Sequence, residues 1–231
     1  MADTPRSALA DTVLTRLTAL YGAAADPVRA VPAAAYMRDQ FTHLGIGTPR
    51  RRELSREVLR GLDPPDTADC TAVALGCWAL AEREYRYFAA DYLRRYVGRC
   101  DSGLLDTVRT LTVTEPWWDT VDVLAAHVTG PLVAADPALV AVMDDWVREP
   151  DMWLVRTAIL HQLDYRDATD QERLFRYCTL QAGHRDFFVR KAIGWALRQY
   201  ARTAPEAVRA YVERERASLS PLSVREALKH L

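Results

Sequence analysis

The chain is poor in cysteine and lacks the short motifs that mark many nucleotide, metal and hydrolase sites. Its four cysteines, Cys70, Cys77, Cys100 and Cys178, form no Cys-x-x-Cys pair. Cys70 and Cys77 stand two turns apart on one predicted helix, too far for a disulfide. We expect reduced thiols and no structural zinc. The sequence contains no P-loop, Rossmann fingerprint, H-E-x-x-H motif, EF-hand or G-x-S-x-G motif, which excludes the sites that those motifs build.

Long apolar runs and an excess of one charge are also absent. No run approaches the length of a membrane span, and the N-terminus lacks the basic-then-apolar plan of a secretory signal, so we expect a cytoplasmic protein without a membrane partner. The 30 basic and 31 acidic residues give a net charge of -1. The totals therefore show no electrostatic footprint for nucleic acid, and DNA binding would require segregated charge. We attribute the scarcity of lysine among the basic residues to codon usage.

The helical period runs through every segment of reasonable length, and strict alternation bounded by hairpin turns is missing. We therefore predict an all-α fold and a single domain over residues 1–231, with residues 1–7 as a flexible tail. From Trp117 onward the helices come in pairs, which indicates a degenerate helical-repeat solenoid with a ligand-binding concavity. A compact bundle is the competing architecture. The predicted helices are 8–24, 28–41, 50–61, 67–81, 84–98, 102–111, 116–133, 137–148, 152–164, 169–182, 185–202, 205–216 and 221–230.

The most informative segment is Glu-Pro-Trp-Trp-Asp-Thr-Val-Asp at 115–122. Pro116 suits the first turn of a helix, and the apolar residues that follow recur at helical spacing. Trp118 and Asp122 are then neighbours on one helical face. A wide flat ring beside a carboxylate is an unusual pairing, and it indicates a site for a flat, positively charged partner.

A second segment, 186–202, places a basic stripe around an indole. At about 100° per residue, one face carries Lys191, Gly194, Trp195, Arg198 and Arg202. Arginines along a groove neutralise phosphates, an aromatic ring among them can contact sugar or base, and the glycine permits close approach. A solvated basic face with one half-buried tryptophan explains the same pattern, so both interpretations stay open.

Arg156 interrupts the otherwise apolar run Met-Trp-Leu-Val-Arg-Thr-Ala-Ile-Leu-His-Gln-Leu at 152–163. A lone buried guanidinium is costly, so Arg156 must pair with a carboxylate or face a cavity that holds an anion. Asp122 is the obvious carboxylate in a repeat-pair geometry. From these residues alone a structural salt bridge is the favoured interpretation. We expect His161, further along the run, to be a satisfied core histidine.

A third basic site is predicted near the N-terminus. Gly47-Thr48-Pro49 reads as a helix start with Thr48 as the cap, followed by Arg50, Arg51 and Arg52. Free N–H groups beside arginines favour an anion such as phosphate. The alternative is a basic helix start that simply faces solvent.

These segments, in this order, resemble the DNA alkylation repair family of HEAT-like-repeat DNA glycosylases, the AlkD-like enzymes. The similarity extends from Tyr36 to the end of the chain. The stretches that carry it are Tyr-Met-Arg-Asp-Gln-Phe with Leu-Gly-Ile-Gly-Thr-Pro-Arg-Arg-Arg, Trp-Trp-Asp-Thr-Val-Asp, Trp-Leu-Val-Arg-Thr-Ala-Ile-Leu-His-Gln-Leu, Phe-Phe-Val-Arg-Lys-Ala-Ile-Gly-Trp-Ala-Leu-Arg-Gln-Tyr and Leu-Ser-Val-Arg-Glu-Ala-Leu-Lys-His-Leu.

The resemblance implies a curved solenoid of HEAT-like antiparallel helix pairs with a concave DNA-binding cleft. It implies a catalytic set of Trp118, Asp122, Arg156 and Trp195, with Tyr36 nearby. Backbone contacts would come from Thr48, Arg52 and Arg198, and the basic stripes add Arg51, Lys191 and Arg202 as DNA-binding candidates. The partner would be alkylated double-stranded DNA, bound by a monomer that needs no obligate protein partner, metal or cofactor.

The activity implied is excision of purines alkylated at N3 or N7, leaving an abasic site, without turning the base out of the duplex. Alkylation makes the base a cationic leaving group, so the residues need only stabilise an oxocarbenium-like sugar and position water, with Asp122 near the anomeric carbon. Two alternatives stay open. One is self-resistance to bulky adenine adducts of a DNA-alkylating antibiotic, and the other is a noncatalytic helical-repeat scaffold that binds DNA or protein.

Overall fold

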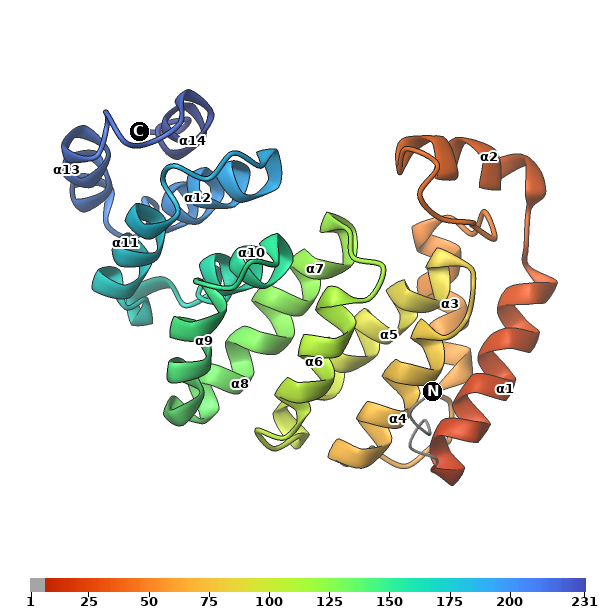
Figure 1. Cartoon of the computed structure of the whole chain (residues 1–231). Coiled ribbons are helices and arrows are strands. Elements are labelled where there is room, and N and C mark those ends of the chain that lie inside the picture. The colour runs from red at the N-terminus through yellow and green to blue at the C-terminus, as the bar shows by residue number, and fades with distance from the viewer. Residues whose placement is uncertain (1–6) are drawn as a thin grey trace. The chain divides into compact units, whose positions relative to one another are not determined.

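The all-α prediction is confirmed. The computed structural model describes residues 7–231, and helices are the only regular elements in that range (Figure 1). The chain divides into two compact units, with the boundary between Thr107 and Val108. The single-domain prediction and the predicted concave cleft stay predictions. Of the predicted tail, residues 1–6 lie outside the described range, and Ser7 caps the first helix by accepting a hydrogen bond from the Ala10 amide.

Unit 1 is a stack of helices whose core includes Leu17, Tyr21 and Phe88. Helix α1 packs against α3 and α4, and α5 packs against the same two helices. By contrast, no residue of α2 is buried. The elements of unit 1 are α1 (Ala8–Ala23), α2 (Pro27–Tyr36), α3 (Thr48–Val58), α4 (Thr67–Trp78), α5 (Arg83–Tyr96) and the 3-10 turn η1 (Val97–Arg99).

A buried carboxylate fixes the segment that leads into α3. Glu84, at the start of α5, accepts hydrogen bonds from the amides of Leu44, Gly45 and Ile46 at 2.9, 2.8 and 3.2 Å. Gly45 has a φ of +82°, and a Cβ there would lie 2.2 Å from the carbonyl oxygen of Asp26, so only glycine fits. The start of α3 is therefore held by α5.

Unit 2 is built around α10, which packs against α7, α9, α11 and α12, while α12 packs against α14. The unit boundary falls within α6 (Leu104–Val113). The remaining elements are α7 (Trp118–Leu124), the π-helical turn η2 (Ala125–Thr129), α8 (Gly130–Ala135), the 3-10 turn η3 (Pro137–Leu139), α9 (Val140–Trp146), α10 (Met152–Leu160), the 3-10 turn η4 (Arg166–Ala168), α11 (Gln171–Leu180), α12 (Phe187–Tyr200), α13 (Pro205–Arg214) and α14 (Pro221–Ala227).

Two predicted helices differ from the observed ones for local reasons. The helix expected at 28–41 ends at Tyr36, because Arg38 and Asp39 adopt left-handed φ angles of 57° and 56°. The helix expected at 116–133 is interrupted by the π-helical turn, which ends two residues before Pro131. Proline has no N–H to continue an α-helical ladder and clashes with the carbonyl four residues back, which a widened turn relieves.

The helices of residues 7–231 are short or polar relative to a membrane span, and no single one is long and apolar enough to cross a bilayer. One pair, Trp118–Ala135 with Pro137–Trp146, meets the length and composition test together but is bent by 120°. Core helices pass the same test, so this pair is weak evidence for a span.

Candidate active site and nucleic-acid interface

The centre of unit 2 holds the predicted pair of Asp122 and Arg156. Arg156 Nε lies 2.7 Å from Asp122 Oδ1, and Arg156 Nη2 lies 2.8 Å from Oδ2, which is a bidentate ion pair. The Arg156 side chain is 4% exposed and that of Asp122 is 16% exposed. The carboxylate therefore reaches the surface while its guanidinium partner does not. Each oxygen of an ionised carboxylate can accept more than one hydrogen bond, so acceptor capacity remains for water or substrate.

Arg156 also ties the pair to a third helix. Its Nη1 donates to the carbonyl oxygen of Phe188 in the first turn of α12. The helices that carry the two partners of this bond both have capped N-termini. Asp151 caps α10 and Asp186 caps α12 through their side-chain oxygens. One guanidinium thus connects α7, α10 and α12, and rotation of any of these helices would strain the site.

Two opposing effects set the pKa of Asp122. Burial raises the pKa of the Asp122 carboxyl above its ordinary value, and the negative charge of Asp119 adds to this effect. The hydrogen bonds and positive charge of Arg156 act against it. The net direction is upward. The carboxyl consequently takes up a proton at a higher pH than a solvent-exposed aspartate does.

The two predicted indoles occupy the two helices that flank α10. Trp118 is the first residue of α7, one turn before Asp122, and Trp195 lies in the second half of α12. Both side chains are half-buried, so part of each ring is at the surface. Pro116 lies before the helix rather than in its first turn, because α7 begins at Trp118 with Trp117 as its cap.

The neighbouring tryptophan has a different role. Trp117 is buried, and its ring centroid lies 6.0 Å from that of Trp153 and 5.1 Å from that of Phe188. Trp153 and Phe188 are 5.0 Å apart, which closes an aromatic cluster among α7, α10 and α12. This cluster packs together the same three helices that Arg156 connects. The sequence spacing placed Trp118 beside Asp122, but it did not indicate that Trp117 is buried.

The basic stripe on α12 has an acidic partner that the sequence pattern did not indicate. Lys191 Nζ lies 2.7 Å from Glu226 Oε1, and Arg198 pairs with Glu226 Oε2. Hydrogen bonds from Lys191, then from Arg198, lower the pKa of Glu226. A Cβ on Gly194 would lie 2.5 Å from the Cβ of Glu226 and 2.9 Å from the carbonyl oxygen of Ser223. Gly194 therefore allows α14 to pack closely against α12.

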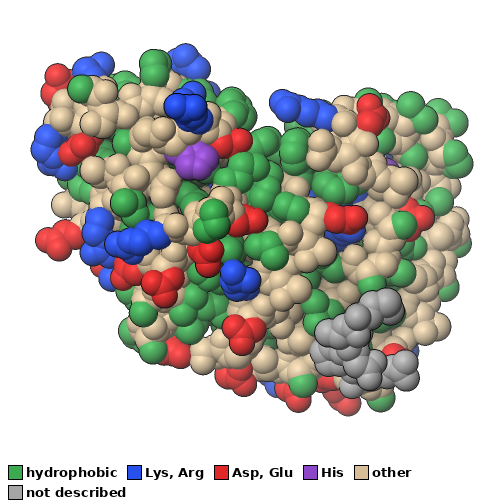
Figure 2. All heavy atoms as spheres, viewed as in Figure 1, with side chains coloured by type: hydrophobic (Ala, Val, Ile, Leu, Met, Phe, Trp, Pro, Cys, Tyr) green, Lys and Arg blue, Asp and Glu red, His purple; other side chains and the backbone are tan. Residues whose placement is uncertain are grey.

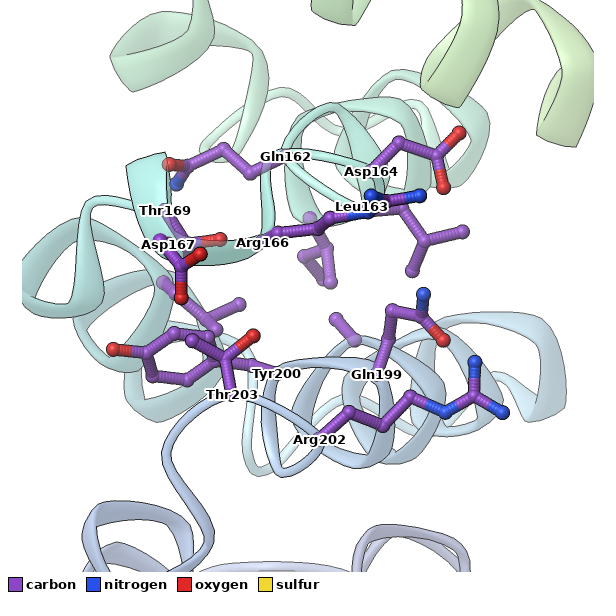
Figure 3. Close-up of a pocket in the computed structure, with 13 residues that line it drawn as sticks. Gln162, Leu163, Asp164, Arg166, Asp167, Thr169, Gln199, Tyr200, Arg202 and Thr203 are labelled. Atoms are coloured by element: carbon purple, nitrogen blue, oxygen red, sulfur yellow. The ribbon is translucent and has the colours of Figure 1, made fainter.

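Arg202 lies apart from this ion-paired cluster, on the rim of a pocket of about 500 Å³ in unit 2. Figure 3 shows Gln199 and Tyr200 from the end of α12, and Arg202 from the turn after it, on one side of the pocket, facing the segment from Gln162 to Thr169. Positive and negative side chains are also intermingled over the face of unit 2 seen in Figure 2. The predicted stripe is thus not a continuous unpaired basic surface.

In unit 1 the predicted phosphate contacts have mixed environments. Thr48 is the first residue of α3 rather than its cap, since Gly47 occupies the cap position and no side chain caps the helix. Thr48 and Arg52 are exposed, and Tyr36, at the end of α2, is 72% exposed. Arg51 points inward, where its Nη1 lies 2.8 Å from Asp91 Oδ2. That pairing favours a structural role for Arg51.

Arg52 borders a surface groove of about 600 Å³ between α3 and α5, which we call the arginine groove. Its floor includes Phe88 and Tyr92, and Asp91, the one carboxylate among its lining residues, already pairs with Arg51. The groove therefore has a net positive rim over an aromatic floor. Only Arg52 of this rim was singled out from the sequence. The lining residues are Pro49, Arg52, Ser55, Arg56, Leu59, Phe88, Asp91, Tyr92, Arg94 and Arg95.

The chain is similar to known proteins in both sequence and structure, and this similarity gives its family. The sequence profile of the DNA alkylation repair enzyme family matches residues 17–231. The chain belongs to this family. One similar solved structure is named "Predicted DNA alkylation repair enzyme from Enterococcus faecalis". It is 30% identical, with 90% of this chain and 96% of that chain covered and a TM-score of 0.79. No curated protein matches the chain.

Membership of the DNA alkylation repair enzyme family confirms the resemblance inferred from the sequence, and with it a helical-repeat fold. It supports an enzymatic role in DNA alkylation repair with DNA as the substrate. Membership does not by itself give the reaction or the lesion. Among the described residues, no group of three or more His, Cys, Asp and Glu side chains is arranged to hold a metal ion.

Proposed function

We propose that the chain is a monofunctional DNA N-glycosylase that excises cationic N3- and N7-alkylated purines, such as 3-alkyladenine and 7-alkylguanine, from duplex DNA in base excision repair. The observation that carries the proposal is the partly exposed Asp122 carboxylate, held by both nitrogens of a buried guanidinium and preceded by Trp118 on the same helix. The proposed enzyme acts as a cytoplasmic monomer, with duplex DNA as its partner.

The alkylated base needs little activation by the protein before it leaves. Alkylation at N3 or N7 gives the purine a positive charge, which weakens the N-glycosidic bond and makes the base a good leaving group without protonation. The developing charge then lies on the deoxyribose, and a fixed carboxylate stabilises it more strongly in the transition state than in the ground state. In the proposed mechanism Asp122 does this and orients the attacking water through its remaining acceptor positions.

Trp118 and Trp195 would contribute through the negative faces of their rings. A cation over an indole face gains on the order of 0.5–2 kcal/mol, depending on how far it is desolvated. That gain increases as the sugar becomes positive, so it favours the transition state. Arg156 is a positioning residue in this account, because it is buried and holds Asp122 in one orientation.

The proposal includes action without turning the base out of the helix. Enzymes that flip bases enclose the lesion in a pocket and read its edge. A base that already carries positive charge needs no acid to protonate it, so no such pocket is required for leaving-group activation. A lesion outside any pocket can also carry a large substituent.

Unit 1 would supply sequence-independent binding. We propose that the arginine groove contacts the DNA backbone through Arg52, Arg56, Arg94 and Arg95, because guanidiniums neutralise phosphates without reading bases. The aromatic floor would pack against sugar. Lys191 and Arg198 would contribute less, since both are paired with Glu226.

The test uses two duplexes that differ only in the lesion, 7-methylguanine or O6-methylguanine, at the same position. The first base is cationic and the second is neutral. We expect chromatography to detect free 7-methylguanine and alkali to cleave the strand at the abasic site, while the O6-methylguanine duplex stays intact. Binding of both duplexes without release of either base would identify the chain as a noncatalytic scaffold and contradict the proposal.

A further inference from the structure

Two of the four cysteines lie in neighbouring segments of unit 1, although α5 separates them in the sequence. Cys70 is in the first turn of α4, and Cys100 follows η1 directly. The Asp101 amide, next to Cys100, donates to Thr67 Oγ1 one helical turn before Cys70, and each thiol perturbs the pKa of the other. Cys70 is fully buried and Cys100 is half-buried, so only one of the two thiols is accessible from solvent.

The backbone around these thiols is fixed by hydrogen bonds between the same two segments. Arg99 Nε donates to the carbonyl oxygen of Pro65 at 3.3 Å, and the Asp101 amide donates to Thr67 Oγ1 at 3.0 Å. Cys100 Sγ itself lies 3.6 Å from the carbonyl oxygen of Tyr96. The loop that carries Cys100 is therefore docked against the start of α4, which carries Cys70.

The two thiols differ in acidity. The neighbouring Cys70 thiol, and after it Thr67, lower the pKa of Cys100, against the opposing effects of burial and of the Asp101 and Asp66 carboxylates. The neighbouring Cys100 thiol, together with burial, raises the pKa of Cys70 far above its usual range. The thiolate therefore forms on the accessible Cys100, and Cys70 keeps its proton.

A third buried group, the Tyr92 hydroxyl, lies near this pair. Within the described part of the chain the Tyr92 hydroxyl finds no hydrogen-bond partner, and the charges of Cys70 and Cys100 contribute to raising its pKa, after burial as the main cause. A buried hydroxyl without a partner is costly, and an oxygen atom added to the Cys100 sulfur would place an acceptor near this donor.

We propose that Cys70 and Cys100 form a redox-reactive pair, in which a hydroperoxide oxidises Cys100 and Cys70 converts the product to an intramolecular disulfide. The Cys100 thiolate attacks the peroxide, an S–O bond forms, the O–O bond breaks, and an alcohol or water leaves. The Cys70 sulfur, losing its proton, then attacks the sulfenic sulfur, an S–S bond forms, the S–O bond breaks, and water leaves. Two electrons pass from the two thiols to the peroxide. A thiol reductant reverses the change.

This pair is distinct from the proposed glycosylase site in unit 2 and does not depend on that activity. A disulfide would close the chain from Cys70 to Cys100 into a loop that contains α5. Because α5 carries Arg94 and Arg95 of the arginine groove, the crosslink would constrain one wall of that groove.

The experiment treats the full-length protein with hydrogen peroxide, blocks remaining thiols with iodoacetamide under denaturing conditions, and maps the digested peptides by mass spectrometry. We expect Cys70 and Cys100 to disappear together into one linked peptide that dithiothreitol separates. Cys77 and Cys178, fully buried elsewhere, serve as internal controls and should remain alkylated.

Two conservative variants assign the order of the steps. In Cys70→Ser, Cys100 should be trapped as a sulfenic acid by dimedone and then over-oxidised. In Cys100→Ser, Cys70 should stay reduced at the same peroxide dose. The proposal is overturned if wild-type Cys100 is over-oxidised while Cys70 remains a thiol, or if Cys77 and Cys178 react as fast as Cys100. It is equally overturned if no linked peptide forms.

Discussion

Both nitrogens on one edge of the Arg156 guanidinium bind the carboxylate of Asp122, and the third donor of Arg156 binds the carbonyl of Phe188. The ion pair is thus a fixed element of unit 2 as well as a candidate catalytic group. An acid held in this way needs no reorganisation when positive charge develops beside it, which is the property that electrostatic catalysis requires.

Removal of one member of this pair should destabilise the fold. Arg156→Ala leaves the Asp122 carboxylate without its partner, and breaking a buried pair on one side costs about 3–5 kcal/mol. We expect the free energy of unfolding, measured by urea denaturation, to fall by an amount in that range. The double variant with Asp122→Ala should lose less than the sum of the single losses. Strict additivity would show that the two side chains do not interact in solution.

Base release should depend on pH through Asp122. Because burial raises its pKa above the ordinary 3.8, lowering the pH protonates the carboxyl earlier than in an exposed aspartate. We expect the single-turnover rate of 7-methylguanine release to fall on the acid side with a midpoint above 3.8. A rate that stays flat until that ordinary value is reached would contradict the role of Asp122.

The same raised pKa has the opposite consequence for stability. The folded state binds this proton more tightly than the unfolded state does, so the contribution of the carboxyl to the free energy of unfolding is largest below the unfolded pKa. It is lost as the pH rises through the raised, folded pKa. As the pH rises through this titration, the rate of base release is therefore expected to rise, while the contribution of Asp122 to the free energy of unfolding falls.

The glycine between the two basic residues of α12 should not tolerate a side chain. In Gly194→Ala the new Cβ would lie 2.5 Å from the Cβ of Glu226, and overpacking of this kind costs about 1–3 kcal/mol. The matched control is Gly22→Ala near the end of α1, where nothing lies within 4 Å of the added Cβ. We expect denaturation to show loss of stability for the first variant and a neutral or slightly stabilising change for the second. Equal stability of both variants would show that α14 does not pack on α12 as described.

Charge reversal in the arginine groove should weaken DNA binding without regard to sequence. We expect Arg94→Glu combined with Arg95→Glu to lower the affinity for unmodified duplexes and to reduce the slope of log affinity against log salt by roughly 1 for each phosphate that the variant no longer neutralises. The control is Arg209→Glu, an exposed arginine on α13 paired with Glu206. Fluorescence anisotropy at several salt concentrations makes the measurement. Weakening confined to one sequence, or equal to that of the control, would contradict the backbone role.

Much of the candidate site could be predicted from the sequence by rules that concern neighbouring residues. The start predicted at residue 152 is confirmed, because Asp151 satisfies amides of the first turn of α10, whereas Asp186 caps α12 although the predicted helix began at residue 185. Arg156 stands in an apolar run, where an unpaired guanidinium is too costly, and this predicted a carboxylate partner that the structure identifies as Asp122. Such inferences need only the neighbouring sequence.

The remaining features depend on tertiary packing and had no local signal. Nothing near Trp117 in the sequence indicates that it turns inward and packs against Trp153 and Phe188. The pairing of Lys191 and Arg198 with Glu226 requires α14 to pack on α12, a contact between segments distant in the sequence. A face that looks like an open basic stripe on a helical wheel is for that reason partly an intramolecular interface.

The most direct test of the central claim is the single-turnover rate of 7-methylguanine release by Asp122→Asn, compared with Asp119→Asn on the same helix. Asparagine preserves the shape of the side chain and removes its charge, and the second variant removes a carboxylate three residues earlier. We expect the Asp122 variant to keep its affinity for duplex DNA and to release the base roughly 100-fold or more slowly, whereas the Asp119 variant stays close to the wild type. Release by Asp122→Asn at the wild-type rate would contradict the account.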